Sequence, residues 1–275
     1  MSKTLSPLRY PGGKSQMIPV IEKWLDKQPL KKKGDLILVE PFAGGASVGL
    51  QLLMDGKIDQ LWINELDEHV YTCWYHMLFN NKFTDMIRSI TVNVKNYKHM
   101  KKILNGDDKW GKEHMALAYF FINRTAHSGL HNSGPIGGYD QSGNYKIDCR
   151  FNKDKLIQRI ENIKKWRGHI RLTNKDGAQL IKEINNTMRH ANIVFYVDPP
   201  YYTQGKVCYR SHFNENNHKV LADVLSDVKL PWLLSYDDCP EIRALYKGWA
   251  KTKRVELNYS NTHKRQYEVL IQRDV

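Results

Sequence analysis

A carboxylate, two prolines and two tyrosines follow one another at residues 198–202. They come directly after residues 193–197, a short apolar and β-branched run that is typical of a strand buried on both faces of a parallel sheet. Proline cannot donate a ladder hydrogen bond, so the strand must end where the two prolines begin. Because open α/β sheets bind ligands at the carboxyl ends of their strands, we expect a site here.

The side chains of this stretch suit a flat ring that carries an amino group. Asp198 can accept a hydrogen bond from an exocyclic amine, the carbonyl of Pro199 can accept a second, and Tyr201 can stack on the ring. A nucleobase taken out of a duplex would need this set of contacts. The same residues are also compatible with a turn that merely ends a strand, so the elements around them have to decide.

Composition limits the kinds of protein that the chain can be. Its 275 residues can hold one large α/β domain, or one such domain with a sizeable insertion. With 41% hydrophobic and 26% charged residues it resembles soluble globular proteins and not disordered ones. The net charge of +13 favours a polyanionic partner, nucleic acid first, with a basic surface that has no partner as the alternative.

Cysteine spacing and hydropathy indicate the cellular setting. The four cysteines are scattered and form no Cys-x-x-Cys pair, so neither a zinc site nor a disulfide framework is indicated. Reduced thiols in the cytosol are the simplest interpretation. No stretch has the length and apolarity of a membrane span, and the first residues lack a signal-peptide core. We expect a soluble intracellular protein.

A glycine turn and an acidic residue follow the first two expected strands. Residues 36–39 read as a buried strand, residues 40–47 (EPFAGGAS) as a turn, and residues 48–54 as a helix. Strand, tight glycine turn and helix form the cofactor crevice of doubly wound sheets. The second strand ends at Glu65, about 20 residues after the turn, where a carboxylate suits the hydroxyls of a ribose. Glu65 is the first choice for this contact and Asp67 the second.

Residues 7–15 (PLRYPGGKS) form a loop before a helix expected at 16–27. The end of the loop looks like a phosphate-binding P-loop, but that pattern needs a glycine where this chain has Leu8, so the P-loop interpretation fails. Paired glycines before Lys14 still let backbone amides and an ammonium group approach a charged ligand. Further along, a strand at 170–174 leads to another acid, Asp176.

Residues 123–152 show no pattern of regular structure and are rich in Gly, Ser, Asn and His. Connections this long are usually functional or disordered. Several of their side chains can contact phosphates or base edges, namely Arg124, His127, His131, Asn132, Asn144, Lys146 and Arg150. A flexible surface loop is the alternative. His127 and His131 could share a metal only on a helix, which the neighbouring glycines disfavour, so we predict no metal site.

The remaining chain supplies the elements that carry these motifs. Residues 69–119 are helical in pattern, and further helices are expected at 154–166, 177–187 and 216–225. Residues 203–217 read as a mobile loop over the substrate. Another buried strand is expected at 232–235, and residues 253–257 and 267–271 alternate apolar and polar side chains, as in a closing antiparallel hairpin.

The motifs, in this order, resemble those of the Dam-type (D12 class) DNA adenine methyltransferases. The stretches that carry the resemblance are residues 7–14 (PLRYPGGK), 41–45 (PFAGG), 64–67 (NELD), Asp176 and residues 198–201 (DPPY), and they cover nearly the whole chain. The resemblance implies an α/β, Rossmann-like S-adenosylmethionine-dependent methyltransferase fold with a mostly parallel sheet and a C-terminal antiparallel hairpin. It implies a catalytic domain of residues 1–69 and 151–275, with a largely helical target-recognition insertion at 70–150 that binds DNA.

The resemblance also implies roles for particular residues. The S-adenosylmethionine-binding residues would be Tyr10, Gly12, Gly13, Lys14, Pro41, Phe42, Ala43, Gly44, Gly45, Ala46, Ser47, Glu65, Asp176 and Asp198. The catalytic set would be Asp198, Pro199, Pro200, Tyr201 and Lys14. Residues 123–124 and 128–129 resemble the family's recognition hairpin, which adds Ser128 to the DNA-contacting residues. The chain departs from the family's Phe-x-Gly-x-Gly turn at Ala46, whose methyl group could narrow the cofactor site.

The predicted activity is methyl transfer from S-adenosylmethionine to the N6 amino group of adenine in double-stranded DNA, with base flipping and direct in-line transfer. Alternatives are an RNA base methyltransferase, a cytosine amino methylase, for which Ser would be expected in place of Asp198, and a catalytically silent DNA-binding protein of the same fold. A cognate restriction endonuclease could accompany the protein. A monomer is the default, and the cytoplasm, as bacterial nucleoid or phage-infected cell, is the expected location.

Overall fold

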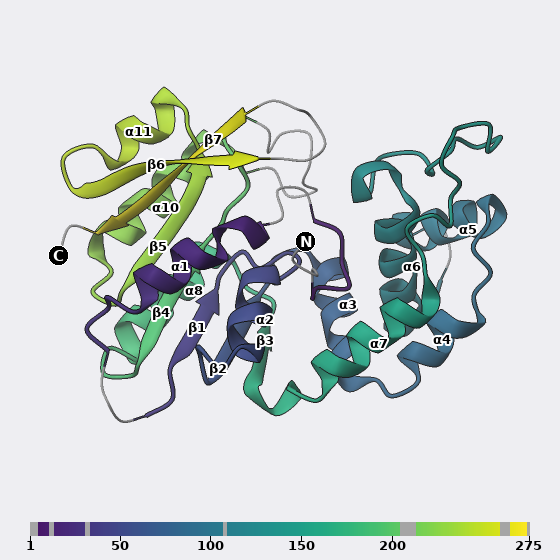
Figure 1. Cartoon of the computed structure of the whole chain (residues 1–275), viewed down its shortest axis with the longest axis horizontal. Coiled ribbons are helices and arrows are strands. Elements are labelled where there is room, and N and C mark those ends of the chain that lie inside the picture. Colours follow the sequence, from purple (N-terminus) through teal and green to yellow (C-terminus); the bar gives the residue numbers. More distant parts are fainter. Residues whose placement is uncertain are drawn as a thin grey trace.

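The computed structural model describes residues 5–10, 14–30, 34–106, 109–203, 213–258 and 265–273. In these residues seven strands form one sheet in the order β3-β2-β1-β4-β5-β7-β6 (Figure 1). The strands are β1 (Ile37–Glu40), β2 (Gln60–Asn64), β3 (Ile170–Thr173), β4 (Ile193–Val197), β5 (Trp232–Asp237), β6 (Ala250–Asn258) and β7 (Arg265–Arg273).

The order of the strands determines where a ligand can enter. Strands β1 to β5 pair in parallel, and β7 runs antiparallel between β5 and β6. The chain passes from β1 outward to β2 and β3 and then returns to β4 on the other side of β1. Strand order therefore reverses between β1 and β4, and the crevice outside their carboxyl ends is the expected binding position. The prediction of a mostly parallel sheet with a C-terminal antiparallel hairpin is confirmed.

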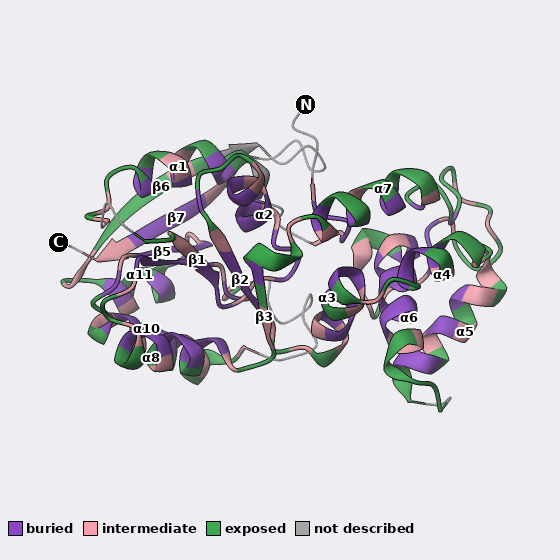
Figure 2. Cartoon of the chain, turned by 90° about the horizontal axis from the view of Figure 1, so that it is seen from below, coloured by how far each residue is buried: buried purple, intermediate pink, exposed green. Residues whose placement is uncertain are grey.

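Helices cover both faces of the sheet (Figures 1 and 2). Successive strand residues point to opposite faces, and β4 shows this clearly, because Tyr196 packs into one apolar layer while Phe195 and Val197 pack into the other. The first layer contains α1 (Ile18–Leu25) and α2 (Ser47–Met54). The second contains α8 (Gly177–Thr187), α10 (Glu215–Asp227) and α11 (Pro240–Tyr246). A strand buried on both faces explains the unbroken apolar run of β4.

A second, helical part of the molecule lies beside the sheet, on the right of Figure 1, and we call it the helical lobe. Its helices are α3 (Glu68–Phe79), α4 (Phe83–Ser89), α5 (Val94–Asn105), α6 (Lys112–Thr125) and α7 (Lys153–Lys164). Helix α6 packs against α3 and α5, and α7 packs against α3 and α4. The apolar layer of α1 and α2 continues into this lobe, so that the two parts share one core.

The predicted elements agree with the structure to within a few residues, apart from the following differences. The helix expected at 16–27 begins as a 3₁₀ turn, η1 (Lys14–Met17), and ends at Leu25. Helix α11 was not predicted, although Pro240 at its first turn is a common start signal. Most of the loop predicted at 203–217 lies outside the described residues. The segment predicted to be irregular, residues 123–152, differs at its start, because α6 extends to Thr125 and a 3₁₀ turn, η2 (His127–Gly129), follows; between residues 130 and 152 the chain has no helix or strand. None of the helices in the described ranges has the length and apolarity needed to cross a membrane.

Candidate active site

The glycine turn between β1 and α2 is packed closely on several sides. Gly44 adopts a φ of 48°, in the left-handed region that favours glycine. A side-chain carbon at Gly44 would lie 2.5 Å from the ring of Tyr10. The Gly44 carbonyl accepts a hydrogen bond of 2.8 Å from Nε1 of Trp74, on α3, and its N–H donates to Oε2 of Glu65 at 3.0 Å. Tyr10, Trp74 and Glu65 therefore enclose Gly44, and a residue with a side chain would not fit there.

Ala46 is the point at which the turn departs from the family pattern. It has φ 45° and ψ 34°, a left-handed conformation, and it precedes the first residue of α2 without a side-chain cap. A left-handed non-glycine residue costs about 1–2 kcal/mol, which explains why a glycine suits this position. The Ala46 side chain is buried against the core.

Glu65 closes the turn from β2. Its two carboxylate oxygens accept the N–H groups of Gly44 and Asp67, at 3.0 and 3.1 Å. Burial raises the pKa of Glu65 to about 7, and the backbone hydrogen bonds oppose that rise. Asp67 caps α3 by accepting the N–H of His69 at 2.8 Å. Both candidates for the ribose contact thus have structural partners already, and their cofactor role stays a prediction.

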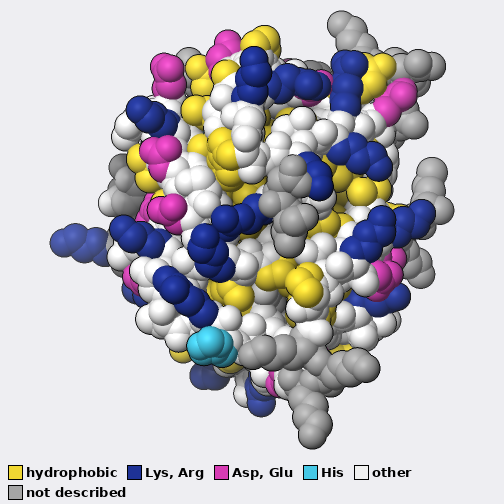
Figure 3. Space-filling model, turned by 90° about the vertical axis from the view of Figure 1, so that its left-hand side faces the viewer, with side chains coloured by type: hydrophobic (Ala, Val, Ile, Leu, Met, Phe, Trp, Pro, Cys, Tyr) yellow, Lys and Arg dark blue, Asp and Glu magenta, His cyan; other side chains and the backbone are white. Residues whose placement is uncertain are grey.

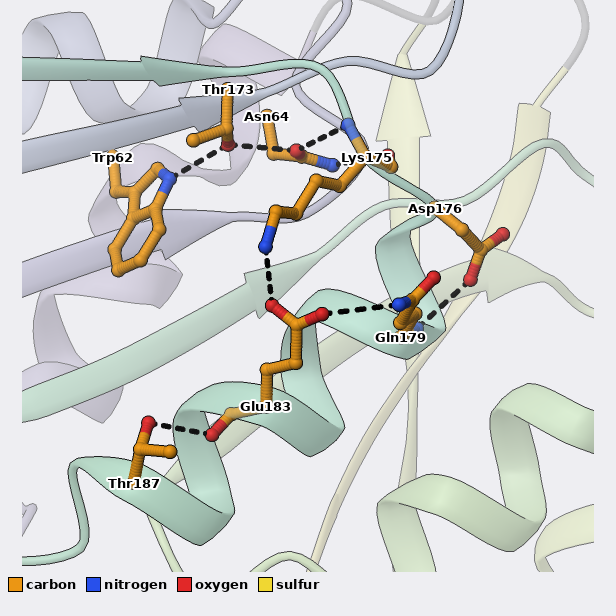
Figure 4. Close-up of polar contacts among 8 residues, drawn as sticks. All are labelled: Trp62, Asn64, Thr173, Lys175, Asp176, Gln179, Glu183 and Thr187. Atoms are coloured by element: carbon orange, nitrogen blue, oxygen red, sulfur yellow. Dashed lines mark hydrogen bonds and ion pairs between the residues drawn. The ribbon is translucent and has the colours of Figure 1, made fainter.

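Asn64, which had no predicted role of its own, connects three strand ends, and Figure 4 shows its contacts with Thr173 and Lys175. Its Nδ2 donates to the carbonyls of Pro41 and Lys175, each at 2.9 Å. Its Oδ1 accepts from Thr173 Oγ1 at 2.8 Å and from the Lys175 N–H at 3.1 Å. The residue is fully buried, so a complete set of partners is what burial of an amide requires. An asparagine at the end of a buried strand is visible in the sequence, but a cofactor role was predicted only for its acidic neighbours, Glu65 and Asp67.

Asp176 lies at the same edge of the sheet. Its Oδ1 accepts the N–H of Gln179 at 2.9 Å and so caps α8 (Figure 4). The next residue, Gly177, packs against Phe42 of the glycine turn, because a side-chain carbon there would lie 2.5 Å from the ring. Asp176 thus lies next to a residue that packs against the glycine turn, and its cofactor role stays a prediction.

Lys14 joins the N-terminal motif to the end of β4. Its ammonium group is buried and donates to Oε1 of Glu268, on β7, at 2.7 Å. It also hydrogen bonds to the hydroxyl of Tyr201 and lies 3.5 Å from Oδ1 of Asp198. Three predicted catalytic residues therefore meet, together with a buried glutamate from the C-terminal hairpin that the sequence did not identify.

Hydrogen bonds, burial and neighbouring charges together set the pKa of Asp198. Its Oδ1 accepts a hydrogen bond of 2.8 Å from Ser235 Oγ, and the hydroxyl of Tyr196 lies 3.1 Å from that same Oγ. Burial raises the pKa of Asp198 to about 6, with a contribution in the same direction from Glu268, while the charge of Lys14 acts against the rise. The carboxylate form therefore predominates at neutral pH, but the group titrates close to it.

A small cavity of about 30 Å³ connects the glycine turn to Asp198. Its lining residues are Lys14, Glu40, Phe42, Ala43, Ser47, Val48, Tyr196 and Asp198. Oε1 of Glu40 accepts the N–H of Gly49 at 2.8 Å, whereas its buried Oε2 has no hydrogen-bond partner in the described part of the chain. Burial raises the pKa of Glu40 to about 8. The carboxyl groups of Asp198 and Glu268 thus lie 3.5 and 2.7 Å from the one ammonium group of Lys14, while Glu40 is mostly protonated at neutral pH, and this surplus of negative charge suits a cationic ligand.

Asp237, at the end of β5, fixes the chain that follows the Asp-Pro-Pro-Tyr motif. Its carboxylate accepts the N–H groups of Tyr202 and Thr203, at 3.0 and 2.9 Å, and the hydroxyl of Thr203. Behind it, Nδ1 of His218 lies 2.7 Å from the Tyr236 hydroxyl, and burial lowers the pKa of His218 to about 4. An acid at a strand end is the signal that identified Asp198, so sequence reasoning could also have found Asp237.

The predicted DNA-contacting residues lie in the helical lobe, apart from this cavity. Six are exposed: His127, Ser128, Asn132, Asn144, Lys146 and Arg150. His131 is half-buried, with its ring 6.2 Å from that of His69. Arg124 is also half-buried, and its guanidinium donates to the Arg150 carbonyl at 2.9 and 2.6 Å. Burial and neighbouring arginines lower the pKa of Arg124 to about 9.

Basic side chains are not confined to the helical lobe. Figure 3 views the molecule from the side of β6 and α11, and Lys and Arg side chains are spread over that face with acidic ones between them. The net charge alone therefore does not locate a DNA surface. Gly12 and Gly13, two of the predicted cofactor residues, lie outside the described residues. Within the described ranges, His, Cys, Asp and Glu side chains form no group of three or more that could hold a metal ion.

Comparison with known proteins agrees with the geometry. The sequence model of the D12 class N6 adenine-specific DNA methyltransferase family matches residues 10–261. A curated relative, the Type II methyltransferase M.MjaIII of Methanocaldococcus jannaschii, is 26% identical over 207 residues, which cover 70% of this chain and 68% of that protein. The rRNA methyltransferase AviRa of Streptomyces viridochromogenes aligns over 96% of this chain and 86% of its own with a TM-score of 0.39 and 12% identity, a likeness too weak to carry an argument.

Proposed function

Because the chain belongs to the D12 class of N6 adenine-specific DNA methyltransferases, we propose that the crevice between β1 and β4 methylates an adenine that has been flipped out of double-stranded DNA. The enzyme is an S-adenosylmethionine-dependent methyltransferase with a Rossmann-like fold. The observation that carries the proposal is that Lys14, Asp198 and the glycine turn line one cavity at the point where strand order reverses.

The residues of this crevice fit a positively charged methyl donor. Gly44 lets the Tyr10 ring pack directly against the backbone of the turn, because a side chain there would collide with that ring. The two carboxylates beside Lys14, those of Asp198 and Glu268, outnumber its single ammonium group. A buried surplus of carboxyl groups stabilises a cation and stabilises a neutral product less. Binding of the sulfonium form and release of the neutral thioether follow from this imbalance.

Asp198, Pro199 and Tyr201 would hold the adenine. Asp198 and the Pro199 carbonyl would accept the two N6 hydrogens, which orients the nitrogen lone pair, and Tyr201 would stack on the ring. Lys14 hydrogen bonds to the Tyr201 hydroxyl and thereby limits the rotation of that ring. Position and electrostatics then supply the rate.

Bound S-adenosylmethionine supplies the electrophilic methyl group: the N6–carbon bond forms as the sulfur–carbon bond breaks, and N6 loses one proton. Asp198 in its carboxylate form can take that proton, because its pKa of about 6 keeps it ionised at neutral pH. We therefore expect direct in-line transfer without a covalent enzyme intermediate.

Substitution of Asp198 tests the assignment. We expect Asp198→Ala to abolish adenine methylation and to leave cofactor binding largely intact. Methylation would be read by single-molecule sequencing of DNA from a methylation-free host that expresses the protein, and cofactor binding by calorimetry on the purified protein. Asp223→Ala, an exposed aspartate on α10, is the matched control and should retain full activity. Near-normal turnover by Asp198→Ala would overturn the assignment.

The helical lobe is the part that we propose for target recognition. Residues 70–150 supply α3 to α6 and the irregular segment with the exposed polar side chains. We further propose that the enzyme is a cytoplasmic monomer, acting in a bacterial nucleoid or a phage-infected cell. A cognate restriction endonuclease would accompany it, as the Type II designation of the curated relative suggests. Light scattering of the purified protein tests the monomer. Protection of DNA at the methylated motif against host restriction enzymes tests the pairing.

A further inference from the structure

The backbone of residues 5–10, which we call the N-terminal strap, is bound to the helical lobe. The Asn123 side chain, on α6, makes two hydrogen bonds to a single residue of the strap. Its Oδ1 accepts the N–H of Arg9 and its Nδ2 donates to the carbonyl of Arg9, each at 2.7 Å. Asn123 is 3% exposed, so water does not compete for these bonds. The Asn123 amide pairs with both the N–H and the carbonyl of Arg9, as the backbone of a neighbouring β-strand would.

Arginine side chains add further bonds between the strap and the lobe. Arg159, on α7, donates to the Ser6 carbonyl at 3.4 Å, and Arg124, on α6, donates to the Pro7 carbonyl at 3.5 Å. In the other direction the guanidinium of Arg9 donates to the Ala126 carbonyl at 3.1 Å. The strap is thus attached to two helices of the lobe along most of its length.

The strap continues directly into the cofactor turn. Tyr10 follows Arg9, and its ring occupies the place where Gly44 would carry a side chain, while its Cβ lies 3.3 Å from the corresponding position at Gly45. Trp74 of the lobe contacts the same turn independently through its bond to the Gly44 carbonyl. In Figure 1 the dark purple strap runs between the sheet and the helical lobe. Because the strap is hydrogen-bonded to the lobe, a movement of the lobe must also move the Tyr10 ring against which Gly44 packs.

We propose that Asn123 is a positioning residue that couples DNA binding by the helical lobe to cofactor binding at the glycine turn, through the backbone of Arg9 and the ring of Tyr10. The inference rests on the proposed function, since it takes the lobe as the DNA-binding part. Coupling is a ratio of affinities and is reciprocal, so DNA should tighten cofactor binding by the same factor by which the cofactor tightens DNA binding.

The experiment measures the cofactor dissociation constant of the full chain by calorimetry, with and without a DNA duplex that contains the motif that the enzyme methylates. S-adenosylhomocysteine serves as the ligand, so that no turnover occurs. We expect the duplex to tighten binding by about fivefold or more in the unsubstituted enzyme, within the usual range of coupling factors. In Asn123→Ala, and in Asn123→Asp, which loses the donor to the Arg9 carbonyl, this ratio should fall below about twofold.

Asn185→Ala is the matched control. Asn185 is also a buried asparagine, on α8, and its Oδ1 accepts the Lys229 N–H at 2.9 Å, far along the chain from the strap. It should lower the melting temperature and leave the coupling ratio unchanged. A ratio that stays at the unsubstituted value in both Asn123 variants would overturn the coupling while the proposed function stands. Absence of adenine methylation by the unsubstituted protein would overturn the proposed function itself.

Discussion

The catalytic crevice and the irregular segment of the helical lobe are built in opposite ways. In the crevice the central polar side chains are wholly or partly buried and held by named partners, as Lys14 is by Glu268 and Asp198 by Ser235. In the segment from 130 to 152 most candidate side chains are exposed, and Lys146 donates to the backbone carbonyls of Gln141 and Gly143. Chemistry requires fixed geometry before the substrate arrives, whereas contacts to phosphates tolerate side chains that adjust on binding.

The contrast predicts that substitutions in the crevice affect stability and chemistry together. The largest effect is expected for Lys14→Met, which would leave the carboxylates of Glu268 and Asp198 without their cation. Removal of one partner from a buried ion pair typically costs about 3–5 kcal/mol. Urea unfolding of the variant beside the unsubstituted enzyme gives the difference in free energy. A loss below about 1 kcal/mol, the usual value of an exposed pair, would show that the pair is not effectively buried.

Gly177→Ala should have the next largest effect. The added methyl group would lie 2.5 Å from the Phe42 ring and must displace it from the glycine turn. Overpacking of this kind costs about 1–3 kcal/mol, and cofactor affinity should fall with it, which thermal unfolding and calorimetry would measure. Gly168→Ala is the control, because a side-chain carbon there meets no atom within 4 Å. Equal effects at both glycines would contradict the close packing of Phe42.

Glu268→Gln should change the pH dependence more than the stability. Glutamine keeps an acceptor for Lys14 but removes the negative charge that helps to raise the pKa of Asp198. Asp198 must be ionised to accept a proton, so a lower pKa moves the acid limb of kcat/KM from about pH 6 to lower pH. The pH profile of methyl transfer measures this shift, with Glu256→Gln on the neighbouring strand as control. An acid limb that stays in place or moves upward would exclude this role of Glu268.

Lys146→Ala should have the smallest effect on the free energy of unfolding, which tests the contrast between the crevice and the exposed segment. An exposed lysine substitution usually changes the free energy of unfolding by less than about 0.5 kcal/mol. If Lys146 contacts a phosphate, DNA binding weakens for all sequences alike and the slope of log K against log salt falls by about 1. Fluorescence anisotropy over a salt series tests this, with Lys219→Ala, exposed on α10, as control. An unchanged salt slope would remove Lys146 from the interface.

Sequence reasoning correctly located residues that follow a recognisable strand end, although their roles stay predictions. Asp198 could be predicted because the prolines fix the end of β4, and ligand positions in parallel sheets are tied to such ends. Glu268 could not, because it lies within an alternating strand. Val269 and Ile271 face one apolar layer, which places Glu268 on the opposite side, where a polar residue normally meets solvent. Only the tertiary arrangement shows that Lys14, not water, covers it.

The limits were similar in the helical lobe. Arg124 was predicted to contact DNA because an arginine in a polar loop suits phosphates, yet its guanidinium binds the carbonyls of Arg150 and Pro7. Phosphates and backbone carbonyls attract the same donors, so the side chain alone does not distinguish them. The bond from Asn123 to Arg9 spans 114 residues and has no local signature at all.

The ion pair between Lys14 and Glu268 joins residues that are 254 positions apart. Contacts of such long sequence separation form late, because the intervening chain must first be ordered. Ribosomes add about 5–20 residues per second, so Glu268 is synthesised more than about ten seconds after Lys14. During that time strands β1 to β5 can assemble into the sheet, but the ammonium group of Lys14 cannot yet pair with Glu268. A nascent chain can thus be folded in most of its core while Lys14 still lacks its ion pair with Glu268.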